Sequence, residues 1–535
     1  MYNHYRSAVD IGSNQINESN DTSAPDDTNE LQGNSSEAHA DEEHMTPVHG
    51  SSEGGQSTAN FDVRDDKAAF KDVMQQMNTS RLNQVAVKLR IDRSQKASSR
   101  PLSLEEMLDV SYTHFTYVYG SYNLAYRIQW KDGTSWFVRI PGHGTRFGQL
   151  DIQKMNSEYQ TMRYVRSHTT IPLPEVIFWT TSPDLAGVPF AIISGAEGGS
   201  LCLAWDEMPE DRRLSTLSEI AGYMAQLHKL SFDMRGMLTF DSAGDVSGVG
   251  PYIALKGNDL QDVVRGGLEM THWRETTTYG PYDSVMAAFD EDIAAQARPG
   301  SERDACLSIL KTALETMPPR LIEDKCFYLT KPDSNWQNIY VNEAGKVTSF
   351  IDWDMVGTET SVIGYARTPI FLCADWNPVN YEYDPGTDDN EEMSPEQLVG
   401  YRTHYSGAFT DAMRHCESYD PRMTNLAHVV WAIDQAIGDR YGQQCVVAKL
   451  MEIAKVPFEL DHHCRDFEKG EEGAKNAIIR NAFAEAWKKG WDVPEGLGCD
   501  GTFEETAEED GGSSESVCLS GSYDQLSDVD GLQGS

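Results

Sequence analysis

Basic residues are scarce in this sequence. Its 535 residues include 44 Lys and Arg against 84 Asp and Glu, which gives a formal net charge of −40. Nucleic-acid binding relies on Lys and Arg contacts with phosphates, so we expect no nucleic-acid partner, whereas a cationic small molecule is compatible with the charge. Long apolar runs are also lacking. No segment reaches the roughly 18 apolar residues that a membrane-spanning helix needs, so we expect no membrane span.

The shortage of bases is greatest at the two ends of the chain. Residues 1–60 contain 11 acidic residues and a single base, Arg6, and residues 500–535 contain 10 acidic residues and no base. Both segments are rich in Ser and Gly and poor in apolar residues, so burial cannot offset the entropy of ordering them. We therefore predict disordered acidic tails at 1–60 and 500–535.

Paired cysteines are absent as well. The nine cysteines are scattered, and none belongs to a C-x-x-C pair. An odd, unpatterned set indicates reduced thiols. The first residues, MYNHYRSAVDIGSNQ, lack the apolar stretch of a secretory signal. We expect a soluble, intracellular, cytoplasmic protein, and the sequence does not indicate its oligomeric state.

Between the tails, the periodicity of apolar residues changes along the chain. Residues 61–114 carry helical patches and form a helical N-terminal extension. Residues 115–199 are rich in β-formers and predict a small lobe: strands at about 115–119, 123–130 and 135–140, a helix at about 152–167, and two further strands. An Asp132-Gly133 pair marks the turn of a hairpin.

Residues 200–499 have a mainly helical pattern. Helices are predicted near 214–232, 302–316, 396–414, 424–438 and 443–455, with one β-region, around Leu329 to Asp354, inside this lobe. The fold class that we predict is therefore α+β and bilobal, with a small antiparallel-sheet lobe carrying one helix and a larger, mainly helical lobe.

The β-region of the large lobe places acidic and amide residues beside apolar strands. Asp333 and Asn338 have the spacing D-x-x-x-x-N, and Asp352 ends the apolar run VTSFID. Carboxylate and amide oxygens are ligands that Mg²⁺ prefers, and a carboxylate on a loop can accept the proton of a hydroxyl group. Transfer of a phosphoryl group would need both functions.

Taken alone, D-x-x-x-x-N favours a simpler interpretation, in which Asp and Asn cap the turns of a polar hairpin. Two interpretations also stay open for Asp354, which could contact an amine or hydroxyl of a substrate or could cap the turn before Gly357.

The whole stretch KPDSNWQNIYVNEAGKVTSFIDWD resembles the H-x-D-x-x-x-x-N and I-D-W-(D/E) signatures of the aminoglycoside phosphotransferase family. The segments WFVRIP, QLHKLSFDMRG and FLCADWNP are similar to its fungal-type branch, and the resemblance runs from about residue 110 to 460. It implies a protein-kinase-like fold and an ATP- and Mg²⁺-dependent transfer of a phosphoryl group to a hydroxyl of a small molecule. By this resemblance Asp333 is the catalytic base, and Asn338 and Asp352 are the metal ligands.

The resemblance also implies a nucleotide site in the small lobe. Gly120 and Ser121 lie in a loop, YGSYN, that is similar to the loop over the nucleotide phosphates. Arg139 in WFVRIP occupies the strand position where kinases usually carry a phosphate-binding lysine, and Glu158 resembles its ion-pair partner. Residues 191–199 are similar to the hinge that joins the lobes and meets adenine.

One departure from the family pattern leaves a second function open. Lys331 stands where the family has a histidine that supports the loop through hydrogen bonds. We expect the lysine to pair with a nearby carboxylate, such as that of Asp333, and so to make this base weaker. The alternative to an enzyme is therefore a catalytically impaired, pseudokinase-like binding module. A protein kinase is disfavoured, because no D-F-G or A-P-E sequence follows IDWD.

Overall fold

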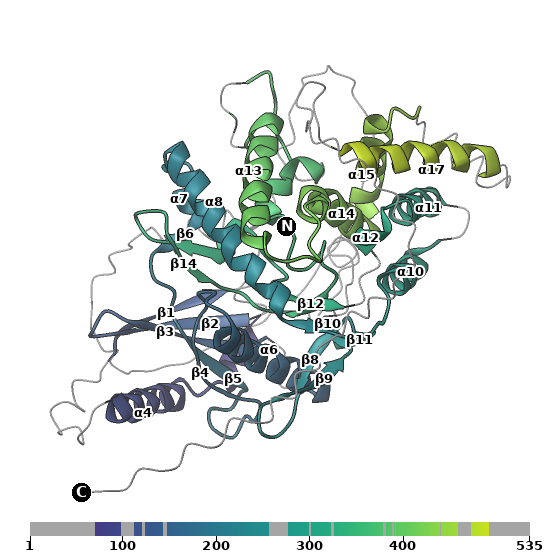
Figure 1. Ribbon diagram of the computed structural model, residues 1–535. Helices are drawn as coiled ribbons and strands as arrows, with labels where there is room; N and C mark the ends of the chain where they lie inside the picture. Colours follow the sequence, from purple (N-terminus) through teal and green to yellow (C-terminus); the bar gives the residue numbers. More distant parts are fainter. Residues whose placement is uncertain are drawn as a thin grey trace, which may run out of the picture. The chain divides into compact units, whose positions relative to one another are not determined.

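The computed structural model describes residues 70–97, 112–119, 123–142, 147–255, 276–298, 301–322, 326–377, 381–387, 390, 392–438, 440–457 and 472–491 (Figure 1). The tails predicted at 1–60 and 500–535 lie outside these residues, as do parts of the predicted 61–114 extension. In the described part of the chain, no helix is both long enough and apolar enough to cross a membrane.

The small lobe is built on a five-stranded antiparallel sheet. Its strands, in the order β1-β2-β3-β5-β4, are β1 (Tyr112–Tyr119), β2 (Asn123–Trp130), β3 (Ser135–Pro141), β5 (Phe190–Ser194) and β4 (Val176–Thr180). The hairpin between β2 and β3 turns at Gly133, whose φ of 84° is the left-handed conformation that glycine adopts without a steric penalty. The strands predicted from alternation are thus confirmed.

The two faces of this sheet contact different helices. Leu124, Tyr126 and Ile128 alternate along β2 and are buried in one core cluster with Phe70 and Leu82, which belong to the segment of α3 (Lys71–Gln76) and α4 (Thr79–Ala97). Residues between the buried positions of β3 must point to the opposite face. Arg139 is such a residue, and helix α6 (Gln149–His168) lies on its side of the sheet, as the Arg139–Glu158 ion pair shows.

The large lobe contains most of the helices. They are α7 (Leu201–Ala204), α8 (Glu210–Ala225), α10 (Val285–Gln296), α11 (Glu302–Glu315), α12 (Pro319–Ile322), α13 (Pro395–Met413), α14 (Arg422–Gly438), α15 (Arg440–Ile453) and α17 (Glu472–Lys489), with the 3-10 helices η3 (Gln226–Lys229), η5 (Trp336–Asn338) and η6 (Ile370–Trp376). Helix α13 begins with a capping box, in which Ser394 and Gln397 bond to each other's main-chain N–H groups. The five predicted helices are present, whereas α10 and α17 were not predicted.

The prediction of a single β-region in this lobe was wrong. Short strands also occur at β6 (Gly199–Ser200), β7 (Ser231–Phe232), β8 (Met237–Phe240), β9 (Val246–Gly250), β10 (Tyr252–Leu255) and β11 (Thr276–Tyr279). They are two to five residues long, too short for a clear alternating pattern. The expected region itself forms β12 (Phe327–Thr330), β13 (Ile339–Val341), β14 (Val347–Phe350) and β15 (Gly357–Glu359).

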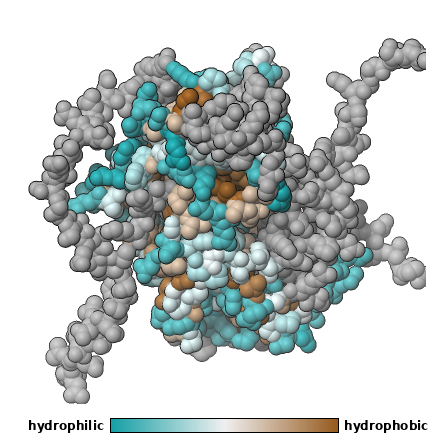
Figure 2. All heavy atoms as spheres, turned by 90° about the vertical axis from the view of Figure 1, so that its right-hand side faces the viewer, coloured by the Kyte–Doolittle hydropathy of each residue, from teal (hydrophilic) through white to brown (hydrophobic). Residues whose placement is uncertain are grey.

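The α+β class, with a small antiparallel-sheet lobe and a larger, mainly helical lobe, is confirmed. Large hydrophobic side chains are mostly covered. Figure 2 shows a face on which hydrophilic residues surround a few hydrophobic ones. Among the described residues, the large hydrophobic side chains with substantial exposure are Leu185, Leu203 and Ile478.

Candidate active site

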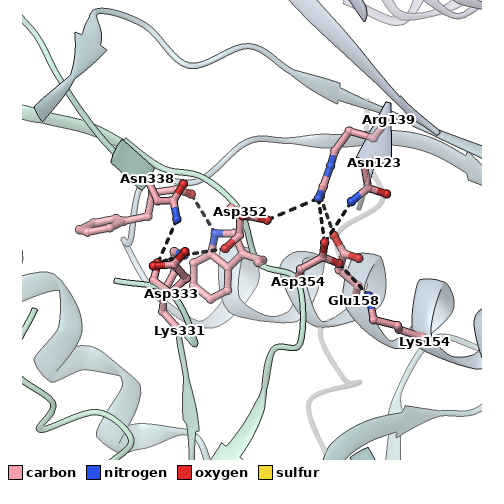
Figure 3. A network of polar contacts seen from close by, with 11 residues as sticks. Asn123, Arg139, Lys154, Glu158, Lys331, Asp333, Asn338, Asp352 and Asp354 are labelled. Atoms are coloured by element: carbon pink, nitrogen blue, oxygen red, sulfur yellow. Dashed lines mark hydrogen bonds and ion pairs between the residues drawn. The ribbon is translucent and has the colours of Figure 1, made fainter. Parts of the chain in front are cut away.

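Strand pairing brings the three acidic and amide residues of the predicted site to one end of a hairpin. Strands β13 and β14 are antiparallel, with Ile339 opposite Phe350. Because the pairing continues one step further, the Ile351 N–H donates to the main-chain oxygen of Asn338 at 2.9 Å. Asn338 and Asp352 therefore lie at the same end of the hairpin, where the loop that carries Asp333 also arrives (Figure 3).

The loop around Asp333 is held by hydrogen bonds from its own residues. Oδ1 of the half-buried Asp333 side chain accepts a hydrogen bond from the main-chain N–H of Asn335 at 3.1 Å. The Asn338 side chain donates through Nδ2 to the main-chain oxygen of Asp333 at 3.5 Å. Since the amide nitrogen is used in this way, the side-chain oxygen of Asn338 is the atom suited to bind a metal.

Lys331 supports this loop, but not in the way expected from the sequence. Its Nζ donates to the main-chain oxygens of Asp333, at 2.5 Å, and Asp352, at 2.6 Å. These bonds go to the main chain and not to the Asp333 carboxylate, so the expected carboxylate pair was wrong as a description of the contacts. The Lys331 side chain is almost fully buried, and burial lowers its pKa to about 8.

The segment that follows β14 has an unusual backbone. Asp352 and Met355 have φ values of 56° and 60°, in the left-handed region that non-glycine residues rarely adopt. Between them, the fully buried Trp353 donates from Nε1 to the main-chain oxygen of Phe350 at 2.8 Å. Such conformations cost of order 1–3 kcal/mol each and persist only where the surroundings impose them.

Arg139 and Glu158 form the expected ion pair. Nη1 of Arg139 lies 2.6 Å from Oε1 of Glu158, and the two side chains are 13% and 6% exposed. The other end of the guanidinium reaches the large lobe, where Nη2 lies 3.5 Å from Oδ1 of Asp352 and 3.4 Å from Oδ2 of Asp354. A planar fork can serve several carboxylates at once, which a lysine cannot do.

Asp354 is the most extensively bonded carboxylate in the site. Besides its contact with Arg139, it accepts a hydrogen bond from Nδ2 of Asn123 at 3.0 Å and another from Nζ of Lys154 at 3.0 Å (Figure 3). Burial alone would raise its pKa, but Lys154 and Arg139 lower it well below the ordinary value, so the carboxylate is ionised. Neither of the two interpretations left open by the sequence, a substrate contact or a turn cap, describes these bonds.

Lys154 was missed in the sequence, and Asn123 was noted only as the last residue of the YGSYN loop, without a role of its own. Lys154 lies one helical turn before Glu158 on α6, and this i, i+4 spacing was the only available signal. For Asn123 the sequence offers no signal beyond its place at the end of the YGSYN loop and the start of β2. Both reach a residue more than 190 positions further along the chain.

Two of the predicted nucleotide-binding residues, Gly120 and Ser121, lie outside the described residues. Arg139 and Glu158 are in place beside Asp352, while Asp333 and Asn338 lie on its other side (Figure 3). No group of three His, Cys, Asp or Glu side chains suited to a metal occurs in the part of the chain that the structure describes. A Mg²⁺ ion bound with a nucleotide does not need one, because it keeps several waters and uses one or two carboxylates together with phosphates.

The Asp352 side chain fits a metal of this kind. It is 40% exposed, and among the described side chains it meets Arg139, at 3.5 Å. Partial burial and the neighbouring Asp354 raise its pKa. A carboxylate that is crowded by like charge gains most from a divalent cation.

The chain is similar to known phosphotransferases. The family model of the phosphotransferase enzyme family, APH, matches residues 119–360, which is less than half of the chain but includes every predicted site residue. None of the curated proteins matches the chain.

Solved structures that resemble this one include a protein of Ralstonia eutropha JMP134, provisionally described as an aminoglycoside phosphotransferase, at 12% identity, covering 75% of this chain and 98% of the other, with a TM-score of 0.39. A streptomycin–ATP complex of APH(2")-IIa shares 14% identity over 66% and 97% of the two chains, with a TM-score of 0.35. Macrolide 2'-phosphotransferase MphH from Brachybacterium faecium shares 12% over 63% and 93%, with a TM-score of 0.33. Similarity at this level does not extend to a substrate.

Proposed function

We propose that this protein transfers the terminal phosphoryl group of ATP to a hydroxyl of a small molecule. One observation carries the proposal: Asp352 lies between the loop of Asp333 and Asn338 on one side and the Arg139–Glu158 ion pair on the other. This arrangement combines a candidate base, candidate metal ligands and a cation for phosphates within one site. The match to the phosphotransferase family over residues 119–360 supports it.

Each residue of the site has a proposed part in the reaction. Asp352 and the side-chain oxygen of Asn338 would hold Mg²⁺, which would neutralise charge on the phosphates when bound. Arg139, aligned by Glu158, would contact the nucleotide, with Gly120 and Ser121 in the loop above it. Asp333, held by the Asn335 N–H, would orient the acceptor hydroxyl and accept its proton.

The large lobe offers an acidic surrounding for the acceptor. Arg235 and Glu359 are paired at 2.7 Å and both are 11% exposed. Burial raises the pKa of the nearby Asp292 to about 6, and the negative charge of Asp434 adds to the effect. Three acids, Glu359, Asp292 and Asp434, thus share the guanidinium groups of Arg235 and Arg367, and because the acids outnumber these cations we propose a cationic acceptor, for example one that carries an amine.

This acidic group is linked to the catalytic loop through Arg367. Its Nη1 donates to the main-chain oxygen of Pro332, next to Asp333, at 2.5 Å. Burial lowers the pKa of Arg367, and the charge of Asp434 opposes this change, so the two residues lie close enough to interact. We infer that an acceptor with its hydroxyl at Asp333 would extend toward Asp434.

The competing function is a pseudokinase-like binding module. This alternative arose because Lys331 replaces the histidine of the family pattern. Lys331 nevertheless donates hydrogen bonds to two main-chain oxygens, so it supports the loop in the way that the resemblance implies for the histidine. The case for an impaired protein is therefore weaker. We therefore favour the enzyme. Membership of the fungal-type branch and a cytoplasmic location remain proposals.

A pair of assays separates the two functions. The thermal shift with Mg·ATP reports nucleotide binding, and ADP release over a panel of hydroxylated amines reports turnover. We expect the parent chain to bind Mg·ATP and to turn it over. We expect the Asp333→Asn variant to bind Mg·ATP with turnover lowered by roughly 10²–10⁴-fold. Binding without turnover on any acceptor would favour the binding module, and a lack of nucleotide binding would contradict both functions.

A further inference from the structure

The two acids on either side of Trp353 have opposite environments. Asp352 is 40% exposed and meets one side-chain partner, Arg139, at 3.5 Å. Asp354 is 16% exposed and accepts from three side chains, two of them at 3.0 Å. A weakly held, exposed carboxylate can turn toward a metal, whereas a buried carboxylate with three donors would have to break those bonds first.

The donors to Asp354 occupy both of its oxygens. Oδ1 accepts from Lys154, and Oδ2 accepts from Asn123 and Arg139 (Figure 3). These donors belong to β2, β3 and α6, so three elements of the small lobe converge on one residue of the large lobe. Asp354 is therefore arranged as an anchor and not as a ligand.

Lys154 is needed because Arg139 alone cannot serve all the acids in the site. The Arg139 guanidinium faces Glu158, Asp352 and Asp354. Lys154 lies on the same face of α6 as Glu158 and supplies the second cation, at 14% exposure. Without it, one guanidinium would face three acidic side chains, and the repulsion between Asp352 and Asp354 would act on the segment that carries both.

That segment is prone to move if its restraints are removed. Its left-handed residues, Asp352 and Met355, lie on both sides of the anchored Asp354. Lys331, from the large lobe, restrains the main chain at Asp352. Two residues further along, the side chain of Asp354 is restrained by polar contacts with the small lobe. Loss of the anchor would allow the backbone to relax to more common conformations and would carry the Asp352 carboxylate away from its position.

We propose that Lys154 is a positioning residue, which holds Asp352 in place for its metal by anchoring Asp354. The inference rests on the proposed function, since it takes Asp352 to be a metal ligand. Residues that orient metal ligands typically change metal affinity 10–100-fold when they are substituted. The alternative roles for these residues are direct contact of Lys154 with a phosphate and direct ligation of the metal by Asp354.

The experiment uses the full chain and the variants Lys154→Met, Lys154→Arg, Asp354→Asn and the double variant Lys154→Met/Asp354→Asn. Lys311→Met is the matched control, because Lys311 also pairs with an aspartate, Asp290 at 2.7 Å, on the surface of the large lobe. Two readouts are needed: amide hydrogen exchange of residues 351–356 in the ligand-free protein, and Mn²⁺ titration in the presence of ATP.

We expect Lys154→Met to increase exchange in 351–356 and to weaken Mn²⁺ binding roughly 10–100-fold. Lys154→Arg should retain most of the affinity, since it keeps the charge. Asp354→Asn should resemble Lys154→Met, and the double variant should be no worse than either single variant, because the two residues act through one bond. Lys311→Met should change neither readout.

Other outcomes would overturn the proposal. Unchanged exchange with weaker binding of metal-free ATP would make Lys154 a phosphate contact. Loss of Mn²⁺ binding in Asp354→Asn alone, with Lys154→Met unaffected, would make Asp354 a ligand. Should Lys154→Met not fold, Asp354→Asn with unchanged exchange would refute the anchor. Increased exchange in variants of a parent that binds neither ATP nor Mn²⁺ would confirm the anchor but refute both the proposed function and the part given to Asp352.

Discussion

Nζ of Lys331 donates a hydrogen bond to the main-chain oxygen of Asp352 at 2.6 Å, and the same atom bonds the main-chain oxygen of Asp333. One buried ammonium group thus joins the loop of the proposed base to the segment of the proposed metal ligand. Residues 331 and 352 are 21 positions apart, on opposite sides of the β13–β14 hairpin, so the bond fixes the relative position of the two segments that carry the proposed base and the proposed metal ligand.

Lys331→Met should therefore lower stability. The substitution leaves two main-chain oxygens without their donor, which costs about 1–3 kcal/mol each, while removal of a buried charge offsets part of this loss. We expect a net decrease of about 1–3 kcal/mol in the free energy of unfolding, measured by urea titration. Lys346→Met, at an exposed position of the β13–β14 turn, is the control, and equal stabilities for the two variants would contradict the assignment.

Asp352→Asn should weaken Mg·ATP binding without lowering the stability of the ligand-free protein. Without a metal, partial burial and the neighbouring Asp354 make the Asp352 carboxylate unfavourable and raise its pKa, so the amide should be neutral or stabilising. Titration calorimetry gives the affinity and thermal unfolding the stability. Asp290→Asn, in a surface pair, is the control. Unchanged Mg·ATP affinity would remove Asp352 from the list of ligands.

Arg139→Lys should weaken Mg·ATP binding although the charge is kept. A single ammonium group cannot contact Glu158 and the two aspartates as the guanidinium fork does. We expect a loss of roughly tenfold in affinity, or about 1.4 kcal/mol. The same change at Arg93, which pairs with Glu175 on the surface of the small lobe, should have no effect on binding. If both variants bind equally well, the fork is not required.

Arg402→Met should be strongly destabilising. Arg402 and Asp375 form a bidentate pair at 2.6 and 3.1 Å, and both side chains are 7% exposed. Breaking a buried pair leaves an uncompensated charge and typically costs about 3–5 kcal/mol, although Lys449, 3.5 Å from Asp375, reduces this cost. The double variant Arg402→Met/Asp375→Leu should recover part of the loss in urea unfolding. A loss below about 1 kcal/mol for the single variant would show that the pair is dispensable.

Asp292→Asn should make stability less dependent on pH. Burial raises the pKa of Asp292 from 3.8 to about 6. Between these two values the folded chain binds more protons at this group than the unfolded chain, so the contribution of Asp292 to stability falls as pH rises toward 6. The asparagine variant should be more stable than the parent by about 1 kcal/mol at pH 7.5, after allowance for solvent screening, and by less at pH 5. An equal difference at both pH values would contradict the raised pKa.

The sequence predicted those parts of the fold in which one residue pattern persists over a whole element. Alternation along β2 and β3 was long enough to give strands and to place Arg139 opposite the buried residues. The antiparallel pairs β8–β9 and β10–β11 were missed because their strands have four or five residues. In such short strands, pairing with a partner decides the conformation more than the local sequence does.

The residues of the candidate site also fall into two groups, those that the sequence predicted and those whose contacts depend on tertiary structure. Asp333, Asn338 and Asp352 lie in one continuous stretch, so their spacing could be read directly. The anchor of Asp354 depends on Asn123 and Lys154, whose approach is a result of tertiary structure and leaves no spacing to detect. The direction of the Lys331 ammonium toward main-chain oxygens was also unreadable, because a sequence does not show which acceptors a buried lysine will face.

The convergence of three small-lobe elements on Asp354 has a consequence for how this chain can evolve. Asn123, Arg139 and Lys154 each satisfy part of one carboxylate, so a mutation at any of them leaves the others with an altered partner. A lineage that replaces Asp354 by a neutral residue would leave Lys154 without its acceptor, while Arg139 would keep its pair with Glu158. We therefore expect positions 123, 154 and 354 to change as a correlated set among descendants of this gene, while Asp352, whose side chain meets Arg139 at 3.5 Å, would be constrained by the metal site that we propose.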